Sequence, residues 1–215
     1  MFDAHVVSVH LGKVAPLGPE KTRSAIVKRA AEGRVAVTPL GLAGDEQADK
    51  SVHGGPDMAV YGYGARHYVT WAAEYPRHAA QFAPGGVGEN LPIDGIVEED
   101  ICVGDIHAIG SALLQVCQPR QPCFKFALKF NDSKLPRAMV QNGRSGWYYR
   151  VVQTGEIAAG DPVSLHARPH PDFAFPRLVE IVNHGEATVD ELRRLAAMEG
   201  LARKLRVMAE KSLSP

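Results

Sequence analysis

Short runs of strand-forming residues, separated by turn residues, fill the first 165 positions and limit the fold more than any other feature. Each run is β-branched, aromatic or alternating, and Gly, Pro or Asp punctuates most of them. Only residues 65–75, stopped by Pro76, and 124–130 have a helical pattern in this part. The pattern predicts a mainly β protein, a mainly antiparallel β-barrel with a few helices. The predicted strands are 5–10, 35–38, 106–109, 112–117, 148–153 and 162–166.

After the Pro-rich stretch 169–176 the pattern becomes helical. Thr188 and Glu191 match a capping box, in which a hydroxyl and a carboxylate satisfy the first amides of a helix. A helix-spaced apolar stripe follows, pauses at Gly200 and resumes. Three short helices hold little core alone, so we expect them to dock on the barrel or on a second chain. The predicted domains are 1–168, the barrel, and 172–215, a C-terminal three-helix appendage.

Charge and cysteine content narrow the class of protein. The 24 Lys and Arg residues balance 24 Asp and Glu residues, which disfavours binding to nucleic acid or to an anionic membrane by bulk charge. No apolar stretch approaches the roughly 18 residues that span a bilayer, and the N-terminus has no signal-peptide pattern. Three cysteines do not suit a disulfide framework. We therefore expect a cytoplasmic protein in a reducing compartment.

A polar, glycine-rich segment at 41–57 is the first candidate binding loop. Its glycines permit close backbone approach, and exposed amides can form an anion nest. A lysine and a histidine would add positive charge and a titratable donor beside that nest. The alternative is a pair of connecting turns with solvated side chains. The candidate residues are Lys50, His53, Gly54, Gly55 and Asp57.

A second polar loop follows Pro84 and contains Glu89 and Asn90. Glu89 can accept hydrogen bonds, and Asn90 can both donate and accept them, as recognition of a heterocycle edge requires. Taken alone, this pattern is typical of a turn.

The loop that carries Cys123 has the most chemistry. Cys123 stands where a predicted helix begins, and two prolines, Pro119 and Pro122, separate it from the strand that ends at Cys117. The helix start and the cations Arg120 and Lys125 stabilise a thiolate, so we predict a depressed pKa for Cys123. A soft thiolate binds a thiophilic metal or acts as a nucleophile. The alternative is an inert, buried cysteine, and that is our prediction for Cys102 and Cys117.

Six motifs occur in order along the chain: GLAGDEQADKSVHGGPDMAVYGY, GGVGENL, VGDIHAIG, QPRQPCFK, GRSGWYYRV and AAGD. Together they resemble the MOSC family, the molybdenum-cofactor sulfurase C-terminal fold, and in particular its small bacterial YiiM-like members. The resemblance covers nearly the whole chain, because the helical tail is similar to the appendage of these members. Met58 stands where the family pattern HGGPDKAV has lysine.

The resemblance implies a β-barrel that binds the molybdenum cofactor (Mo-molybdopterin), with Cys123 as a direct metal ligand. It also implies reduction of N-hydroxylated compounds such as 6-hydroxylaminopurine, a detoxification of N-hydroxylated bases. An external flavoprotein, haem or iron–sulfur carrier would supply electrons, since the chain has no flavin or iron–sulfur motif. The expected cofactor-binding residues are Lys50, His53, Gly54, Gly55, Glu89, Asn90, Arg120 and Cys123, and the expected catalytic residues are Cys123, His53, Asp57 and Glu89.

Two other functions remain open at this point. Cys123 could carry a persulfide in a sulfur carrier or sulfurtransferase without metal. The chain could also be a non-enzymatic cofactor-binding module that contacts a partner through its helical tail. A homodimer is open as well, and the sequence names neither the substrate nor the electron donor.

Overall fold

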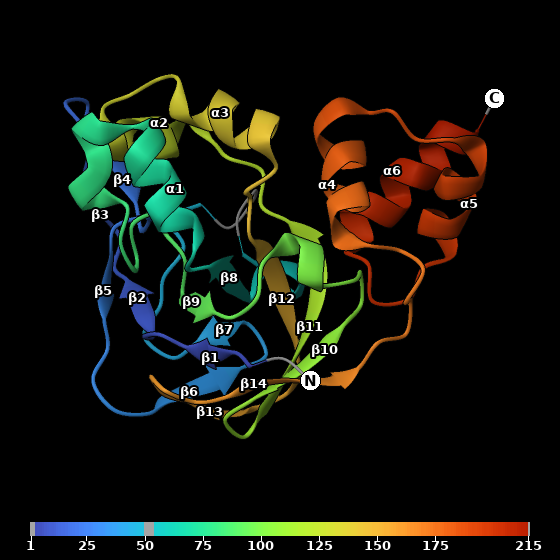
Figure 1. Cartoon of the computed structure of the whole chain (residues 1–215), viewed down its shortest axis with the longest axis horizontal. Helices are drawn as coiled ribbons and strands as arrows, with labels where there is room; N and C mark the ends of the chain where they lie inside the picture. The colour runs from blue at the N-terminus through green and yellow to red at the C-terminus, as the bar shows by residue number, and fades with distance from the viewer. Residues whose placement is uncertain (1–2, 50–53, 215) are drawn as a thin grey trace.

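The computed structural model describes residues 3–49 and 54–214, and its largest sheet has seven strands in the order β1-β9-β8-β12-β11-β10-β14 (Figure 1). Neighbouring strands run antiparallel except β8 and β9, which run parallel. A parallel pair needs a long crossover, and here the crossover contains helix α1 (His67–Glu74). The strands are β1 (His5–Val6), β8 (Val60–Gly64), β9 (Leu91–Asp94), β10 (Ile106–Ile109), β11 (Ala112–Pro119), β12 (Trp147–Gln153) and β14 (Val163–Ala167).

The two edges of this sheet meet, so that it nearly closes into a barrel. The backbone nitrogen of Val6 donates to the carbonyl of Asp161 at 3.0 Å, and that of Val163 donates to the carbonyl of Ala4 at 2.8 Å. Closure removes the unpaired strand edges that an open sheet would expose. The predicted mainly β, barrel-like fold is therefore confirmed, and its sheet is mainly antiparallel, with β8 and β9 as a parallel pair.

The predicted strand 5–10 is divided in the structure, because the chain changes partners along it. Val7 bonds to the carbonyl of Pro92 in β9, whereas the carbonyl of Val9 accepts a hydrogen bond from Ala31, beyond β5. The chain thus leaves the large sheet and enters a separate hairpin. The smaller sheets pair β2 (His10–Gly12) with β5 (Lys28–Ala30), β3 (Ala15–Leu17) with β4 (Thr22–Ser24), and β6 (Val35–Thr38) with β7 (Gly41–Leu42) and β13 (Gly155–Ile157).

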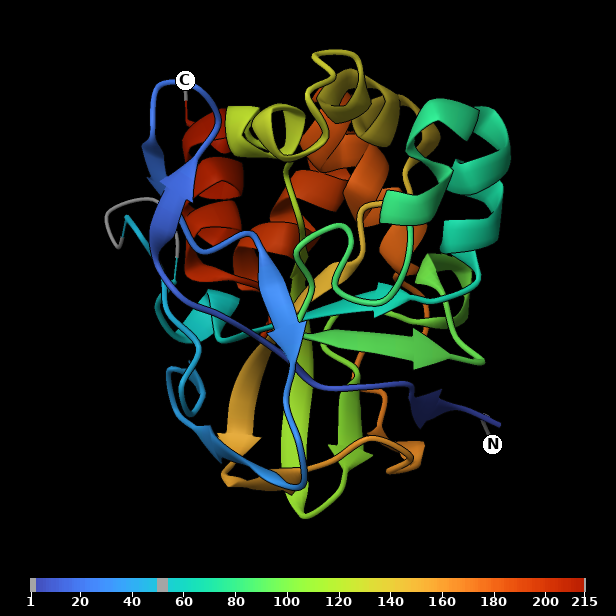
Figure 2. The ribbon, with the colours of Figure 1, turned by 90° about the vertical axis from the view of Figure 1, so that its left-hand side faces the viewer.

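Three helices cover one end of the barrel: α1, α2 (Phe124–Phe130) and α3 (Leu135–Asn142) (Figure 1). The β3–β4 hairpin lies against α2, as Figure 2 shows. Beneath these helices lies an aromatic cluster that includes Trp71, Phe126 and Phe130. Helix α2 has the predicted bounds, while α3 was absent from the sequence prediction.

Three more helices form the C-terminal tail: α4 (Phe175–His184), α5 (Val189–Ala197) and α6 (Arg203–Leu213). The predicted capping box is present, since Thr188 Oγ1 accepts from the Glu191 amide at 3.2 Å and Glu191 Oε2 accepts from the Thr188 amide at 2.8 Å. None of the helices in the described part of the chain is long and apolar enough to cross a membrane.

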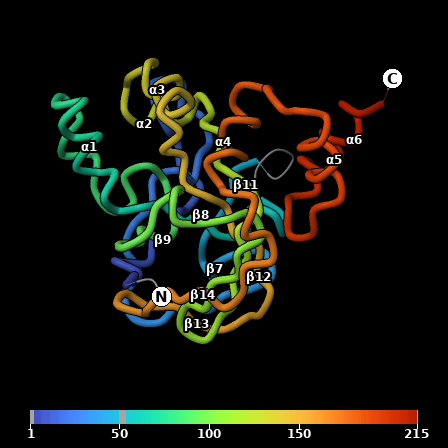
Figure 3. Tube along the Cα trace, turned by 45° about the vertical axis from the view of Figure 1, so that its right-hand side comes forward, coloured from blue at the N-terminus to red at the C-terminus, as the bar shows by residue number. Residues whose placement is uncertain are grey.

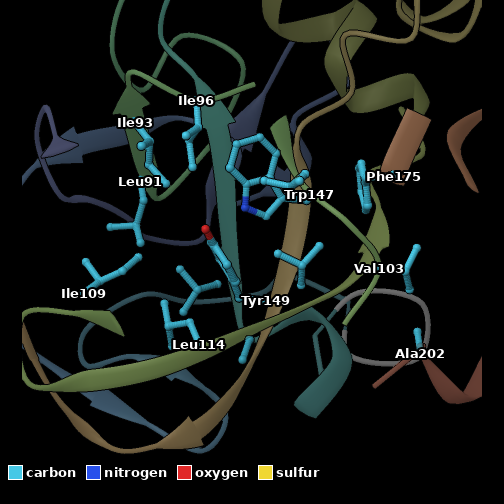
Figure 4. Close-up of a cluster of buried hydrophobic side chains, with 14 of the residues drawn as sticks. Leu91, Ile93, Ile96, Val103, Ile109, Leu114, Trp147, Tyr149, Phe175 and Ala202 are labelled. Carbon is cyan, nitrogen blue, oxygen red and sulfur yellow. The ribbon is translucent and has the colours of Figure 1, made fainter. Parts of the chain in front are cut away.

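The tail helices lie at one side of the barrel (Figure 3) and share its hydrophobic core. Phe175 and Ala202 belong to the same buried cluster as Trp147 and Leu114 of the barrel (Figure 4). A continuous core means that tail and barrel stabilise each other. The division into domains at 1–168 and 172–215 stays a prediction.

Candidate functional site

A cleft opens between the β2–β5 hairpin, the start of α2 and the segment that contains Gly54 and Met58. It holds about 730 Å3 of space, including the part that is open to solvent. The side chains that line it and matter for its chemistry are Lys28, Asp45, Asn90, Arg120, Cys123 and Tyr148. Of the residues predicted to bind the cofactor, the structure brings Cys123, Arg120, Asn90 and Gly54 together at this cleft.

Cys123 is half-buried in this cleft, at the residue that precedes α2. Strand β11 continues to Pro119, which pairs with Trp147 of β12, so only residues 120–122 separate the barrel from Cys123. The thiol does not cap the helix, since Cys123 makes no side-chain hydrogen bond to the amides of α2. A link of three residues, which follows Pro119 and contains Pro122, thus holds the Cys123 thiol at the cleft, close to the end of strand β11.

Arg120 is a buried cation in the wall of the same cleft, with 6% of its surface exposed. Its guanidinium lies over the rings of Phe126 and Tyr61, at 4.7 and 5.3 Å from their centroids, and Nη1 donates to Met139 Sδ at 3.1 Å. Burial by itself lowers the pKa of Arg120, but the neighbouring Tyr61, Tyr148 and Cys123 outweigh it, and the net pKa is raised.

No carboxylate in the described part of the chain forms an ion pair with Arg120. A buried charge without a counter-charge is costly in a folded protein. Because Arg120 borders the cleft, an anionic group bound there would supply the missing charge. The cleft is therefore suited to an anionic ligand.

Lys28 and Asp45 form a buried ion pair in the wall of the same cleft, and no pattern in the sequence pointed to this pair. Asp45 Oδ1 accepts from Lys28 Nζ at 2.5 Å and from the Gly12 amide at 2.6 Å, and Oδ2 accepts from Asn90 Nδ2 at 2.9 Å. Burial lowers the pKa of Lys28, and the Asp45 carboxylate opposes that shift. The amide of Asn90 is further occupied, since its Oδ1 accepts from the Tyr61 backbone at 3.1 Å.

Glu89 lies behind the cleft wall and does not line the cleft. Its carboxylate is fully buried, accepts from the Val87 amide at 3.0 Å, and also accepts from the Gly85 amide and the Tyr68 hydroxyl. These bonds shape the glycine loop whose Gly88 does line the cleft. The predicted catalytic and cofactor-binding roles of Glu89 stay predictions, while its observed contacts are structural.

The candidate residues of the glycine-rich segment 41–57 also separate into those that line the cleft and those that do not. Gly54 lines the cleft, whereas Gly55 and Asp57 do not. The Asp57 carboxylate faces strand β12 and the start of α6 instead. Lys50 and His53 lie outside the described residues.

The other two cysteines are buried, as predicted. Burial raises the pKa of both Cys102 and Cys117. The Cys117 thiol donates to the carbonyls of Asp57 at 3.1 Å and Tyr148 at 3.3 Å. Neither thiol lines the cleft, which leaves Cys123 as the cysteine exposed to a ligand there.

Residues 49–164 match the MOSC domain. The chain belongs to the MOSC family. It is 40% identical to protein YiiM of Escherichia coli over 209 residues, which cover 97% of this chain and 92% of that protein. It is 39% identical over 180 residues to a protein of Gibberella moniliformis named as a reductase; the match covers 82% of this chain and 32% of that protein.

Solved structures of MOSC relatives have the same fold. The crystal structure of YiiM from Geobacillus stearothermophilus aligns with a TM-score of 0.82 at 32% identity, over 98% of this chain and all 100% of that one. The crystal structure of YiiM from Escherichia coli aligns with a TM-score of 0.76 over 94% of this chain. The resemblance inferred from the six sequence motifs is thus confirmed over nearly the whole length.

Proposed function

We propose that this protein is a molybdenum-cofactor-dependent reductase of N-hydroxylated compounds such as 6-hydroxylaminopurine, with Cys123 as the protein ligand of the metal. The observation that carries this proposal is the meeting, in one cleft, of the half-buried Cys123 thiol and the buried, carboxylate-free Arg120. A molybdenum cofactor combines a thiophilic metal with an anionic pterin phosphate. The metal is suited to a sulfur ligand such as Cys123, and the phosphate is suited to a cation such as Arg120.

Other cleft residues have supporting roles. Lys125 adds a second cation beside Cys123, and Gly54 and Gly88 bring backbone close to the bound group. Tyr148 and Ile26 give the wall an apolar part that excludes water and contacts a planar substrate. Asn90 and Lys28 act on the cleft through Asp45, by keeping the hairpin wall in place.

When bound, the cofactor supplies the two-electron chemistry that removes the hydroxylamine oxygen. Overall, R–NHOH takes up two electrons and two protons and gives R–NH2 and water. Among the predicted proton donors, the carboxylates of Glu89 and Asp57 are held by internal hydrogen bonds, and His53 lies outside the described residues. The electrons come from an external flavoprotein, haem or iron–sulfur carrier.

Two findings support the reductase over a binding module. The chain is similar to a protein named as a reductase, and part of the cleft that contains Cys123 is open to solvent, as access of a substrate requires. An odd number of cysteines, three in all, does not suit a disulfide framework, which supports a reducing, cytoplasmic location.

The test is molybdenum content and pterin fluorescence of protein purified from a host that makes the cofactor. We expect stoichiometric molybdenum in wild type and in Cys102→Ala, a control that removes a thiol outside the cleft, and none in Cys123→Ala. Loaded protein with a reduced viologen dye should convert 6-hydroxylaminopurine to adenine. Wild type without molybdenum, but with a reducible added sulfur on Cys123, would refute the proposal and favour the sulfur carrier.

A further inference from the structure

Asp57 joins the barrel to the C-terminal helices through its carboxylate. Oδ1 accepts from Arg150 Nε at 2.9 Å and Nη2 at 2.5 Å, both from strand β12. Oδ2 accepts from the backbone nitrogen of Arg203, the first residue of α6, at 2.7 Å. The Arg150 and Asp57 side chains are only 27% and 23% exposed, so water weakens this pair less than a surface pair.

The backbone of Asp57 also makes hydrogen bonds at this junction, the place where strands β11 and β12 of the barrel meet the start of α6. Its carbonyl accepts from Gln118 Nε2 at 2.6 Å and from Cys117 Sγ at 3.1 Å, at the end of β11. The carbonyl of Cys117 in turn accepts from the amide of Ala202, the residue before α6, at 2.9 Å. The start of α6, the end of β11 and the 3-10 helix Pro56–Met58 therefore form one hydrogen-bonded unit.

This junction borders the cleft, because Gly54 and Met58 on either side of Asp57 line it. Gly54 and Gly55 have φ angles of +94° and +80°, which few other residues adopt. The backbone of the 3-10 helix includes a hydrogen bond from the Met58 amide to the Gly55 carbonyl at 3.1 Å. So short a turn is weak by itself, and the carboxylate and carbonyl of Asp57 bind it to Arg150, to Gln118 and to the start of α6.

We propose that the C-terminal helices hold the Gly54–Met58 part of the cleft wall in place through Asp57, which makes Asp57 a positioning residue. Its two carboxylate oxygens are directed to Arg150 and to the start of α6, not into the cleft. The tail therefore completes the cleft wall rather than forming a separate module. In its consequences for ligand binding, this inference rests on the proposed function.

The first test is amide hydrogen exchange on the full-length, cofactor-free chain. Asp57→Asn removes the charge pair but retains an acceptor, and we expect exchange of residues 55–59 to become about tenfold faster. Arg150→Gln should give the same effect, and the double variant no more than Asp57→Asn alone. The control, Asp172→Asn, makes the same substitution at the exposed Arg194–Asp172 pair of 2.7 Å and should leave residues 55–59 unchanged. Unchanged exchange in both Asp57→Asn and Arg150→Gln would overturn the proposal.

The second test uses the molybdenum-loaded protein. Asp57→Asn should raise KM for the hydroxylamine several-fold and speed loss of the cofactor, while kcat keeps its pH profile. Loss of an ionisation from the kcat profile would identify Asp57 as a proton donor and overturn the positioning role. If wild type binds no molybdenum, the proposed function fails, whereas the exchange experiment still decides whether the Asp57 carboxylate holds the Gly54–Met58 part of the cleft wall in place.

Discussion

Lys28 Nζ and Asp45 Oδ1 lie 2.5 Å apart in the cleft wall, and their side chains are only 7% and 5% exposed. Asp45 follows β7 whereas Lys28 begins β5, so the pair fastens the β2–β5 hairpin to the rest of the barrel. The Asp45 carboxylate also accepts hydrogen bonds from the Gly12 amide and from Asn90 Nδ2, so three donors stabilise its charge. The geometry of the cleft wall therefore depends on this one carboxylate.

Asp45→Asn should lower the free energy of unfolding by about 3 kcal/mol, because it leaves Lys28 charged, buried and unpaired. The control is Glu46→Gln, the same change at the next residue, where the Lys13–Glu46 pair is 70% and 44% exposed. We expect a much smaller loss for that variant, since exposed pairs contribute little. Chemical denaturation of both variants measures the difference, and equal losses would contradict the assignment.

Gly88 is a second position at which a substitution should disturb the cleft wall. Its φ is +91°, and a Cβ there would lie 2.7 Å from Ile26 Cγ1. Gly88→Ala should therefore destabilise the protein by about 1–3 kcal/mol more than Gly33→Ala, through overpacking. Gly33 is the matched control because its φ is +69° with nothing within 4 Å of a Cβ. Thermal unfolding compares the two; equal shifts would show that Ile26 moves aside freely.

The three cysteines should differ sharply in reactivity. Cys102 and Cys117 are buried with raised pKa values, while Cys123 is half-buried at the cleft. Since thiolate character and access control alkylation, iodoacetamide should label one cysteine per native chain, and Cys123→Ser should abolish that labelling. Three cysteines should react after unfolding in denaturant. Peptide mass spectrometry identifies the site, and fast native labelling at Cys117 would be inconsistent with its burial.

His107 should make the protein sensitive to mild acid. Its ring is fully buried with Nδ1 2.8 Å from the Tyr149 hydroxyl, and burial lowers the pKa of His107 from 6.5 to about 4. Between those values the unfolded chain binds a proton that the folded chain does not. Stability from this group is thus complete above pH 6.5 and falls as the pH drops towards 4, by up to about 3 kcal/mol.

The measurement is the free energy of unfolding from pH 7 to pH 4. His107→Gln should be less stable than wild type at pH 7 but should lose less stability on acidification. The control is His166→Gln, at an exposed histidine of β14, which should follow the wild-type curve. A His107→Gln curve parallel to wild type would show that other groups cause the acid sensitivity.

Local patterns in the sequence predicted local structure well. The apolar spacing of 124–130 predicted α2, and the Thr188–Glu191 box predicted the start of α5. Missing from the prediction were helix α3, which begins with Leu135-Pro136, strands β7, β8, β9 and β13, and the hairpin strands near residues 15–30. The hairpin strands have three residues each; β4 and β5 carry mostly polar or charged side chains, and β3 contains Pro16. So short a segment has no reliable periodicity, and its pairing partner determines its conformation.

The chemical type of a residue predicted its role in the site less well than local patterns predicted secondary structure. Glu89 and Asp57 have carboxylates suited to catalysis, yet the fold directs one to a glycine loop and the other to Arg150 and α6. Arg120 lies at the cleft, but its lack of a carboxylate partner can be recognised only once the side chains that pack around it are known. Lys28 gave no signal, because it lies in an ordinary polar hairpin.

The sequence by itself determined the family, the barrel-like class, the capped tail helices and the place of Cys123 beside a helix. These features depend on motifs and on patterns within about ten neighbouring residues. Only the tertiary structure decided which side chains face the cleft, because their partners are distant in the chain. Asp57 is 93 residues from Arg150 and 146 from Arg203, and no local pattern specifies such a contact. Packing of the barrel against the tail brings these groups together, and burial then determines which of them remain charged, paired or available to a ligand.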